Sequence, residues 1–211
     1  MSKTWLTSDP HFWHLNVIRY CNRPYTTVEE MNEKLILNWN KVVGPDDIVY
    51  VLGDFSLASR AVETILPRLN GRKKLILGNH DFPHPAHQKG RKLELREKWT
   101  KLYLQYGFES VELEGELNVE GVANFRLFHL PYSDPTDTHQ DGRPRHFKER
   151  RPDDGKPLLC GHVHDKWLFK RTEKGTPQLN VGVDAPGAPW HMRPASLEEV
   201  MEVYLKETQD E

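Results

Sequence analysis

Five short polar motifs, each placed directly after an apolar run, are the feature that most constrains the fold of this chain. Three of the runs, 5–8, 48–52 and 75–77, have the composition of buried strands, and the runs 125–128 and 158–160 precede the last two motifs. In chain order the motifs are Asp9-Pro10-His11, Gly53-Asp54, Gly78-Asn79-His80-Asp81, His129 and Gly161-His162-Val163-His164. Because ligands of open α/β sheets bind beyond the carboxyl ends of strands, we expect the five motifs to converge on one sheet edge.

Helical patterns separate the apolar runs, as in proteins that combine helices with a largely parallel sheet. Thr27 and Ser196 each stand three residues before a glutamate, in the order of a capping box that begins a helix. Gly71 and Gly107 follow two further apolar patterns and are expected to end helices. The predicted helices are 28–42, 61–69, 93–106 and 197–206, and shorter strands are expected within 108–129 and 167–183.

The composition is that of a soluble globular protein, and we expect a single domain over 1–211. The net charge of −2 gives no general attraction to nucleic acid or to anionic membranes. The N-terminus lacks the apolar stretch of a signal peptide, and no run reaches the ~18 apolar residues of a membrane span. A cytoplasmic protein without a membrane partner is therefore predicted. Cys21 and Cys160 are expected to be reduced thiols.

The side chains of the motifs are carboxylates, imidazoles and one amide, without cysteine. This donor set suits borderline divalent ions such as Mn²⁺, Fe²⁺, Zn²⁺ or Ni²⁺. The candidate ligands outnumber those of one tetrahedral site and suffice for two ions if one carboxylate bridges them. They are Asp9, His11, Asp54, Asn79, His129, His162 and His164.

Each motif alone also has a structural interpretation. Asp9 could form an Asx turn before Pro10, and His129 could be a hydrogen-bonded histidine at a strand end. The pair His162 and His164 is harder to explain in this way, because side chains two residues apart share one face of an extended segment. The combination of all five motifs favours a metal site.

The five motifs extend from Asp9 to His164, and together they resemble the calcineurin-like metallophosphoesterase superfamily. The residues around them, such as Ser8-Asp9-Pro10-His11-Phe12-Trp13-His14, are similar to those of small bacterial and phage members. The resemblance implies an α/β fold, a four-layer α-β-β-α sandwich in which helices flank two mixed sheets. It also implies two divalent metal ions, with Mn²⁺ favoured and Fe, Zn or Ni as alternatives.

The resemblance assigns roles to the motif residues. One metal is expected on Asp9, His11 and His164. The other is expected on Asn79, His129 and His162, with Asp54 as the bridge between the two. A hydroxide between the ions would attack phosphorus in line. His80 would protonate the leaving oxygen or stabilise the developing charge, and Asp81 would orient His80 and support its protonated form.

Residues outside the motifs give weaker indications of a substrate site. The segment 133–157 is long and irregular, and its basic residues either bind a substrate phosphate or are solvated. His14 either reaches the phosphate or caps the following helix, and Arg23 either binds phosphate or forms a surface ion pair. Trp190 is a candidate wall of the pocket. The basic-loop candidates are Arg143, Arg145, His146, Arg150 and Arg151.

We therefore predict a dinuclear metal-dependent phosphoesterase, and favour phosphodiesters, such as a cyclic nucleotide, a dinucleotide or a nucleic-acid end. A phosphomonoesterase or protein phosphatase is the alternative within enzymes. A non-catalytic metal-binding scaffold is the alternative outside them, although it predicts a damaged ligand set, which this sequence does not show. The sequence leaves open whether the protein is a monomer or a homodimer.

Overall fold

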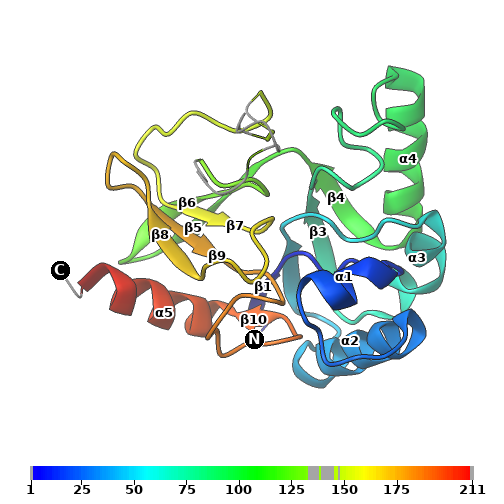
Figure 1. Ribbon diagram of the computed structural model, residues 1–211, viewed down its shortest axis with the longest axis horizontal. Helices are drawn as coiled ribbons and strands as arrows, with labels where there is room; N and C mark the ends of the chain where they lie inside the picture. The colour runs from blue at the N-terminus through cyan, green and yellow to red at the C-terminus, as the bar shows by residue number, and fades with distance from the viewer. Residues whose placement is uncertain (1, 133–137, 139–144, 147, 210–211) are drawn as a thin grey trace.

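The computed structural model describes residues 2–132, 138, 145–146 and 148–209, and it contains two five-stranded sheets with flanking helices (Figure 1). The first sheet has the order β10-β1-β2-β3-β4, in which β1 to β4 are parallel and β10 is antiparallel. Its strands are β1 (Thr4–Thr7), β2 (Ile48–Val51), β3 (Arg72–Ile76), β4 (Phe108–Glu112) and β10 (Ala195–Ser196). The predicted α/β fold with two mixed sheets is confirmed.

The second sheet has the order β5-β6-β7-β9-β8 and is also mixed. Its central pairs, β6 with β7 and β7 with β9, are parallel, whereas both outer pairs are antiparallel. Its strands are β5 (Gly115–Val119), β6 (Ala123–Leu127), β7 (Leu158–Cys160), β8 (Phe169–Arg171) and β9 (Pro177–Asn180).

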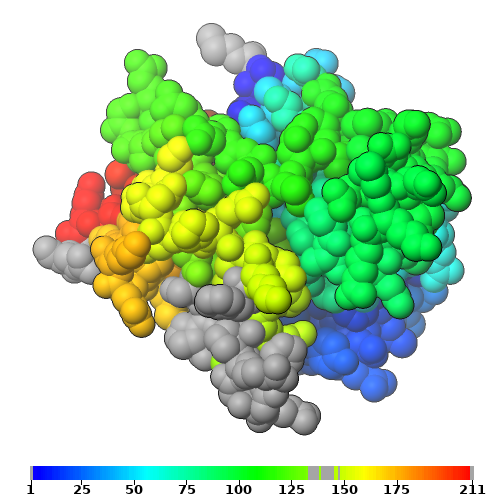
Figure 2. Space-filling view, turned by 90° about the horizontal axis from the view of Figure 1, so that it is seen from above, coloured from blue at the N-terminus to red at the C-terminus, as the bar shows by residue number. Residues whose placement is uncertain are grey.

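Among the described residues, four helices pack beside the first sheet, and a fifth, which contacts β1 and β10, lies below the second sheet (Figure 1). Seen from above, α4 with the preceding segment, and the second sheet with its loops, form neighbouring parts of one face (Figure 2). The helices are α1 (Leu15–Tyr20), α2 (Val28–Val42), α3 (Ser59–Thr64), α4 (Leu93–Tyr106) and α5 (Leu197–Gln209). None of those in the described ranges is long and apolar enough to cross a bilayer.

The helix ends largely follow the sequence signals. The hydroxyl of Thr27 accepts from the backbone N–H of Glu30, and Gly107 ends α4. At Ser196 the capping box is reciprocal, because its hydroxyl accepts from the N–H of Glu199 while the Glu199 carboxylate accepts from the N–H of Ser196. Each of these bonds satisfies a backbone donor at a helix terminus.

The predicted helix 61–69 is wrong in its second half. The α-helix α3 ends at Thr64, and a short 3₁₀ turn, Leu66–Arg68, replaces the last part. Pro67 explains the change, because proline has no N–H to continue an α-helical ladder. Gly71 consequently lies in the turn before β3 and ends no helix.

The core has two main parts. One packs α1 to α4 against the first sheet and includes Met31, Trp39 and Phe55. The other lies between the sheets and includes Leu6 and Leu127. Trp190 is fully buried in this second cluster and donates from its indole to the carbonyl of Gly182. The suggestion that Trp190 lines a pocket is therefore wrong, because its ring is core.

Candidate metal centre

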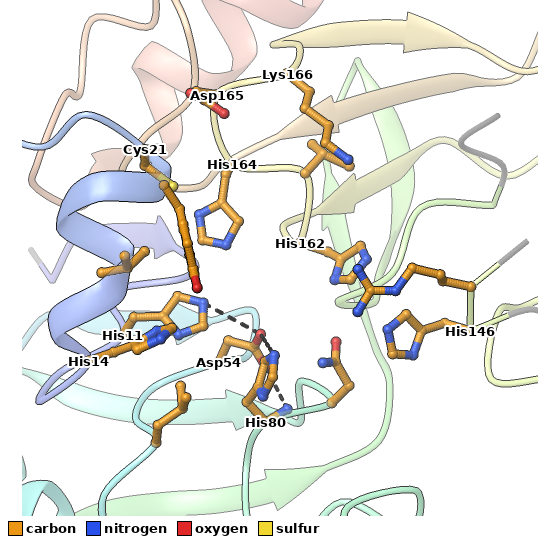
Figure 3. Close-up of a pocket in the computed structure, with 16 residues that line it drawn as sticks. His11, His14, Cys21, Asp54, His80, His146, His162, His164, Asp165 and Lys166 are labelled. Atoms are coloured by element: carbon orange, nitrogen blue, oxygen red, sulfur yellow. Dashed lines mark hydrogen bonds and ion pairs between the residues drawn. The ribbon is translucent and has the colours of Figure 1, made fainter. Parts of the chain in front are cut away.

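The first sheet presents two carboxylates, an amide and an imidazole beyond its strand ends, and the second sheet presents three imidazoles. The structure brings them together around one pocket at the junction of the two sheets (Figure 3). The expected single sheet edge is thus replaced by the facing ends of two sheets. In chain order the side chains are Asp9, His11, Asp54, Asn79, His129, His162 and His164.

One oxygen of Asp54 occupies the centre of this group. Its Oδ2 atom lies 3.6 Å from Nε2 of His11 and 3.4 Å from Nε2 of His129. The other oxygen, Oδ1, accepts a hydrogen bond of 2.9 Å from the backbone N–H of His80. The carboxylate is therefore anchored through one oxygen and faces imidazoles of both sheets with the other, as a bridging ligand requires.

In Asp9, too, one carboxylate oxygen is held by a backbone N–H and the other faces imidazoles. Its Oδ2 atom accepts from the backbone N–H of His162 at 2.8 Å, whereas Oδ1 lies 3.6 Å from Nε2 of His11 and 3.8 Å from Nε2 of His164. His129 is oriented in a comparable way, because its Nδ1 contacts the carbonyl of Leu52 at 2.7 Å. In the neutral imidazole, the form that can bind a metal, that contact places the proton on Nδ1 and leaves Nε2 as an acceptor.

Several of these atoms are buried and have no hydrogen-bond partner among the described residues. They include Oδ1 of Asp9, Nε2 of His11, Oδ1 of Asn79 and Nε2 of His129. Such atoms are rare in folded proteins, because an unsatisfied buried polar atom costs about 1–3 kcal/mol. Divalent cations would satisfy these acceptors, so the residues present fit the metal centre that the sequence predicts.

Backbone strain is concentrated at the same residues. Five of the candidate ligands adopt the left-handed region, where residues other than glycine are uncommon. Their φ angles lie between 48° and 70°, at Asp9, His11, Asp54, His162 and His164. The sequence-based expectation of an extended segment at the last two is therefore wrong. The left-handed turns instead bring the ring of His162 next to His129 and that of His164 next to His11.

Two glycines are required by the close approach of the ligand loops. A Cβ atom at Gly78 would overlap the backbone and carboxylate of Asp54, and one at Gly161 would overlap Ser8 and the carboxylate of Asp9. Each glycine therefore lets one ligand loop pass against another. This packing explains why glycine precedes Asn79 in one motif and His162 in another.

The structure contradicts the role assigned to Asp81. Its carboxylate accepts from three backbone N–H groups, those of Gly78, Asp54 and Phe55, at 2.8 to 3.0 Å. These bonds hold the second and third ligand loops together, and they occupy the carboxylate that was expected to orient the imidazole of His80. Burial and the charge of Asp54 raise the pKa of Asp81 to about 7. Asp81 is a residue that positions the loops.

In the metal-free protein, the charges of the carboxylates and imidazoles at the site shift one another's pKa values. Burial would raise the pKa of Asp9, but the charges of His164 and His129 hold it below its usual value. Burial would lower the pKa of His129, but the charges of Asp54 and Asp9 raise it to about 9. Protons on the imidazoles thus balance the buried carboxylates, and a bound cation would take their place.

A pocket of about 450 Å³ opens over the candidate ligands. His80 faces it with 46% of its side chain exposed. His14 and His146 lie on opposite sides (Figure 3), and Arg145 also lines the pocket. Burial lowers the pKa of His14 to about 4, and its side chain makes no capping hydrogen bond to α1.

The other residues of the basic segment lie elsewhere or outside the described residues. Arg143 is among the latter. Arg150 donates to the carbonyl of Pro131, and Arg151 pairs with Glu114. Neither arginine lines the pocket, so their predicted contact with the substrate phosphate is not supported.

Comparison with known proteins decides the family. The family model described as calcineurin-like phosphoesterase matches residues 2–206. This chain belongs to the calcineurin-like phosphoesterase family. The sequence resemblance is therefore confirmed. The family is one of hydrolases with a dinuclear metal centre, in agreement with the ligand groups of this structure.

Relatives of this calcineurin-like phosphoesterase occur in phages and archaea. It is 37% identical to the Gene 66 protein of Mycobacterium phage L5, over 89% of each chain. A protein of Methanocaldococcus jannaschii is 52% identical over 84 residues, which cover 38% of this chain and 48% of the relative. A solved structure, a protein of unknown function from Aquifex aeolicus, has a TM-score of 0.63 and 25% identity, and the match covers 96% of this chain and all of that one.

Sequence reasoning missed one acidic residue of this phosphoesterase. Asp184 is buried and contacts both the candidate ligand His164 and the guanidinium of Arg23. Neither interpretation offered for Arg23 holds, because its side chain is fully buried against Asp184. The signal was available, since Asp184 follows the apolar residues after β9 as the other acids follow their strands.

Proposed function

We propose that this protein hydrolyses phosphodiesters with two divalent metal ions, Mn²⁺ favoured, held by the seven candidate ligands. The observation that carries the proposal is the set of buried acceptor atoms without partners around the carboxylate of Asp54. When bound, such ions lower the pKa of a coordinated water and neutralise charge on the phosphate oxygens. Aspartate, asparagine and imidazole donors suit Mn²⁺ and similar ions.

His80 is the proposed general acid. Its imidazole is half-exposed at the pocket, while its backbone N–H is fixed by Asp54. Its Nε2 atom is 4.0 Å from the Asp54 carboxylate, next to the ligand cluster yet open to a substrate. In this position it would give a proton to the leaving oxygen, a step worth roughly 10²–10⁴-fold in rate.

The preference for a diester rests on the shape of the pocket. Its walls extend to both sides of the ligands, with α1 on one side and His146 on the other (Figure 3), and Arg145 also lines it. The α1 side presents Val17 and Tyr20, which suit an apolar or planar group. A phosphodiester carries an organic group on each side of phosphorus, so a nucleotide or dinucleotide could occupy both walls.

The test compares bis-p-nitrophenyl phosphate with p-nitrophenyl phosphate, using Mn²⁺-loaded protein. We expect a higher kcat/KM for the diester, and Asp54→Ala serves as the control for contaminating hydrolases. Faster cleavage of the monoester would replace the proposal by a phosphomonoesterase. Metal binding without cleavage of either compound, or of cyclic nucleotides, dinucleotides and RNA ends, would favour a non-catalytic scaffold.

A further inference from the structure

Asp184 lies between a candidate metal ligand and a buried arginine. Its Oδ2 atom is 2.9 Å from Nδ1 of His164. The guanidinium of Arg23 donates to both of its oxygens, from Nε at 2.9 Å and from Nη2 at 2.7 Å. This two-point pairing fixes the plane of the carboxylate, because each of its oxygens is held by a separate N–H group of the planar guanidinium.

Arg23 is itself held by the loop that carries the first motif. Its Nη2 donates to the carbonyl of Asp9 at 2.7 Å and its Nη1 to the carbonyl of Pro10 at 2.8 Å. The arginine thus joins the loop after β1 to the loop after β9, and those loops belong to different sheets. The side chains of Arg23 and Asp184 are 0% and 1% exposed, so solvent does not screen the pair.

The contact with Asp184 determines which nitrogen of His164 can bind a metal. A carboxylate only accepts, so Nδ1 of His164 carries the proton and Nε2 keeps its lone pair. Nε2 faces Oδ1 of Asp9 at 3.8 Å. Metal-binding histidines commonly donate their second N–H to a carboxylate, which orients the ring and makes it a stronger ligand.

We propose that Asp184, locked in place by Arg23, is a positioning residue that sets the orientation and tautomer of His164 and so the affinity of one of the two metal positions. The inference rests on the metal centre of the proposed function. The same pair connects the His164 loop of the second sheet to the Asp9 loop of the first, because Asp184 contacts His164 and Arg23 donates to the carbonyl of Asp9. It therefore aligns ligands from both sheets before a metal binds.

The experiment is a Mn²⁺ titration of metal-free protein by calorimetry, comparing the wild type with Asp184→Asn. The amide keeps the volume but replaces one carboxylate oxygen with an NH₂ group. That group must then face an N–H donor of Arg23 or of His164. We expect one of two Mn²⁺ positions to weaken by roughly 10–100-fold and the other to change little. Glu199→Gln is the matched control, because Glu199 also forms a two-point pair with an arginine, Arg193, and neither residue lines the pocket.

A second variant covers the case in which Asp184→Asn fails to fold. Arg23→Lys keeps the buried charge but loses the fork, so we expect a smaller loss of affinity at the same position. Wild-type affinity at both positions in folded Asp184→Asn or Arg23→Lys protein would overturn the inference. An equal loss of affinity in Glu199→Gln would also overturn it, because the effect would then be one of general stability. A wild-type protein that binds no Mn²⁺ would instead overturn the proposed function.

Discussion

The two sheets bring different chemistry to the same site. The first sheet supplies all the candidate oxygen ligands, from Asp9, Asp54 and Asn79, whereas the three candidate ligands of the second sheet are all imidazoles. A short contact joins the two sheets, since Oδ2 of Asp54 lies 3.4 Å from Nε2 of His129. Neither sheet therefore holds all the candidate ligands, and the site forms only where the two sheets are docked.

The site loops of the two sheets also differ in the apolar clusters that support them. The first packs against α1 to α4 through a large cluster that includes Met31 and Trp39. The second has a smaller cluster on Phe128, Leu130 and Tyr132 beside its site loops. We therefore expect the oxygen ligands to be held more rigidly than the imidazoles, and metal binding to stabilise the docking of the second sheet on the first.

The largest effect is expected where the two sheets share one ligand. Asp54→Ala removes the oxygen that faces imidazoles of both sheets, so we expect loss of both metal ions and a fall in kcat/KM of at least about 10³-fold. Elemental analysis and hydrolysis of bis-p-nitrophenyl phosphate measure the two losses. Retention of two ions per chain would show that the sheets hold their metals independently.

The next largest effect is expected at His80, and it distinguishes loss of catalysis from loss of metal binding. His80→Ala should keep both metal ions, because His80 is outside the ligand set, while turnover of esters with poor leaving groups falls by roughly 10²–10⁴-fold. Hydrolysis of p-nitrophenyl esters should fall much less, since that leaving group needs little protonation. Loss of metal in this variant would contradict the proposed role.

A smaller effect is expected from the packing of one sheet loop on the other. Gly161→Ala introduces a Cβ against Ser8 and Asp9, so we expect a loss of about 1–3 kcal/mol in the free energy of unfolding, with weaker metal binding. Urea denaturation measures the first and calorimetry the second. Gly44→Ala is the control, because a Cβ there makes only ordinary contact with Asp47. Equal stability of the two variants would show that the two loops can move apart to accept the added Cβ at no cost.

The smallest effect concerns the balance of charge between the sheets. In metal-free protein the pKa of His129 is raised to about 9, so its protonated form stabilises the fold fully below its ordinary pKa of about 6.5. That contribution is lost as the pH rises through about 9, and the Tm of metal-free protein should fall by a few degrees over this range. Saturating Mn²⁺ should remove most of the decline, because bound imidazole is neutral. Parallel thermal melts with and without Mn²⁺ provide the measurement.

Much of the fold was predictable because its signals are local. The capping boxes at Thr27 and Ser196 and the glycine at the end of α4 each act through bonds within a few residues. The helix 61–69 was mispredicted for a reason that is also local, because Pro67 interrupts its apolar pattern. The role of Asp81 was different, since its carboxylate reaches backbone N–H groups that lie 26 and 27 residues away.

The candidate donor set, its order along the chain and the family could be read from the sequence, because each motif is a short run of residues that is recognisable without the rest of the fold. Three features follow only from the docked fold: the meeting of the candidate ligands between two sheets, their left-handed turns, and the pairing of Arg23 with Asp184. Arg23 and Asp184 are separated by 161 residues in the chain. No local pattern encodes a hydrogen bond over that distance, and only docking of the two sheets brings its partners together.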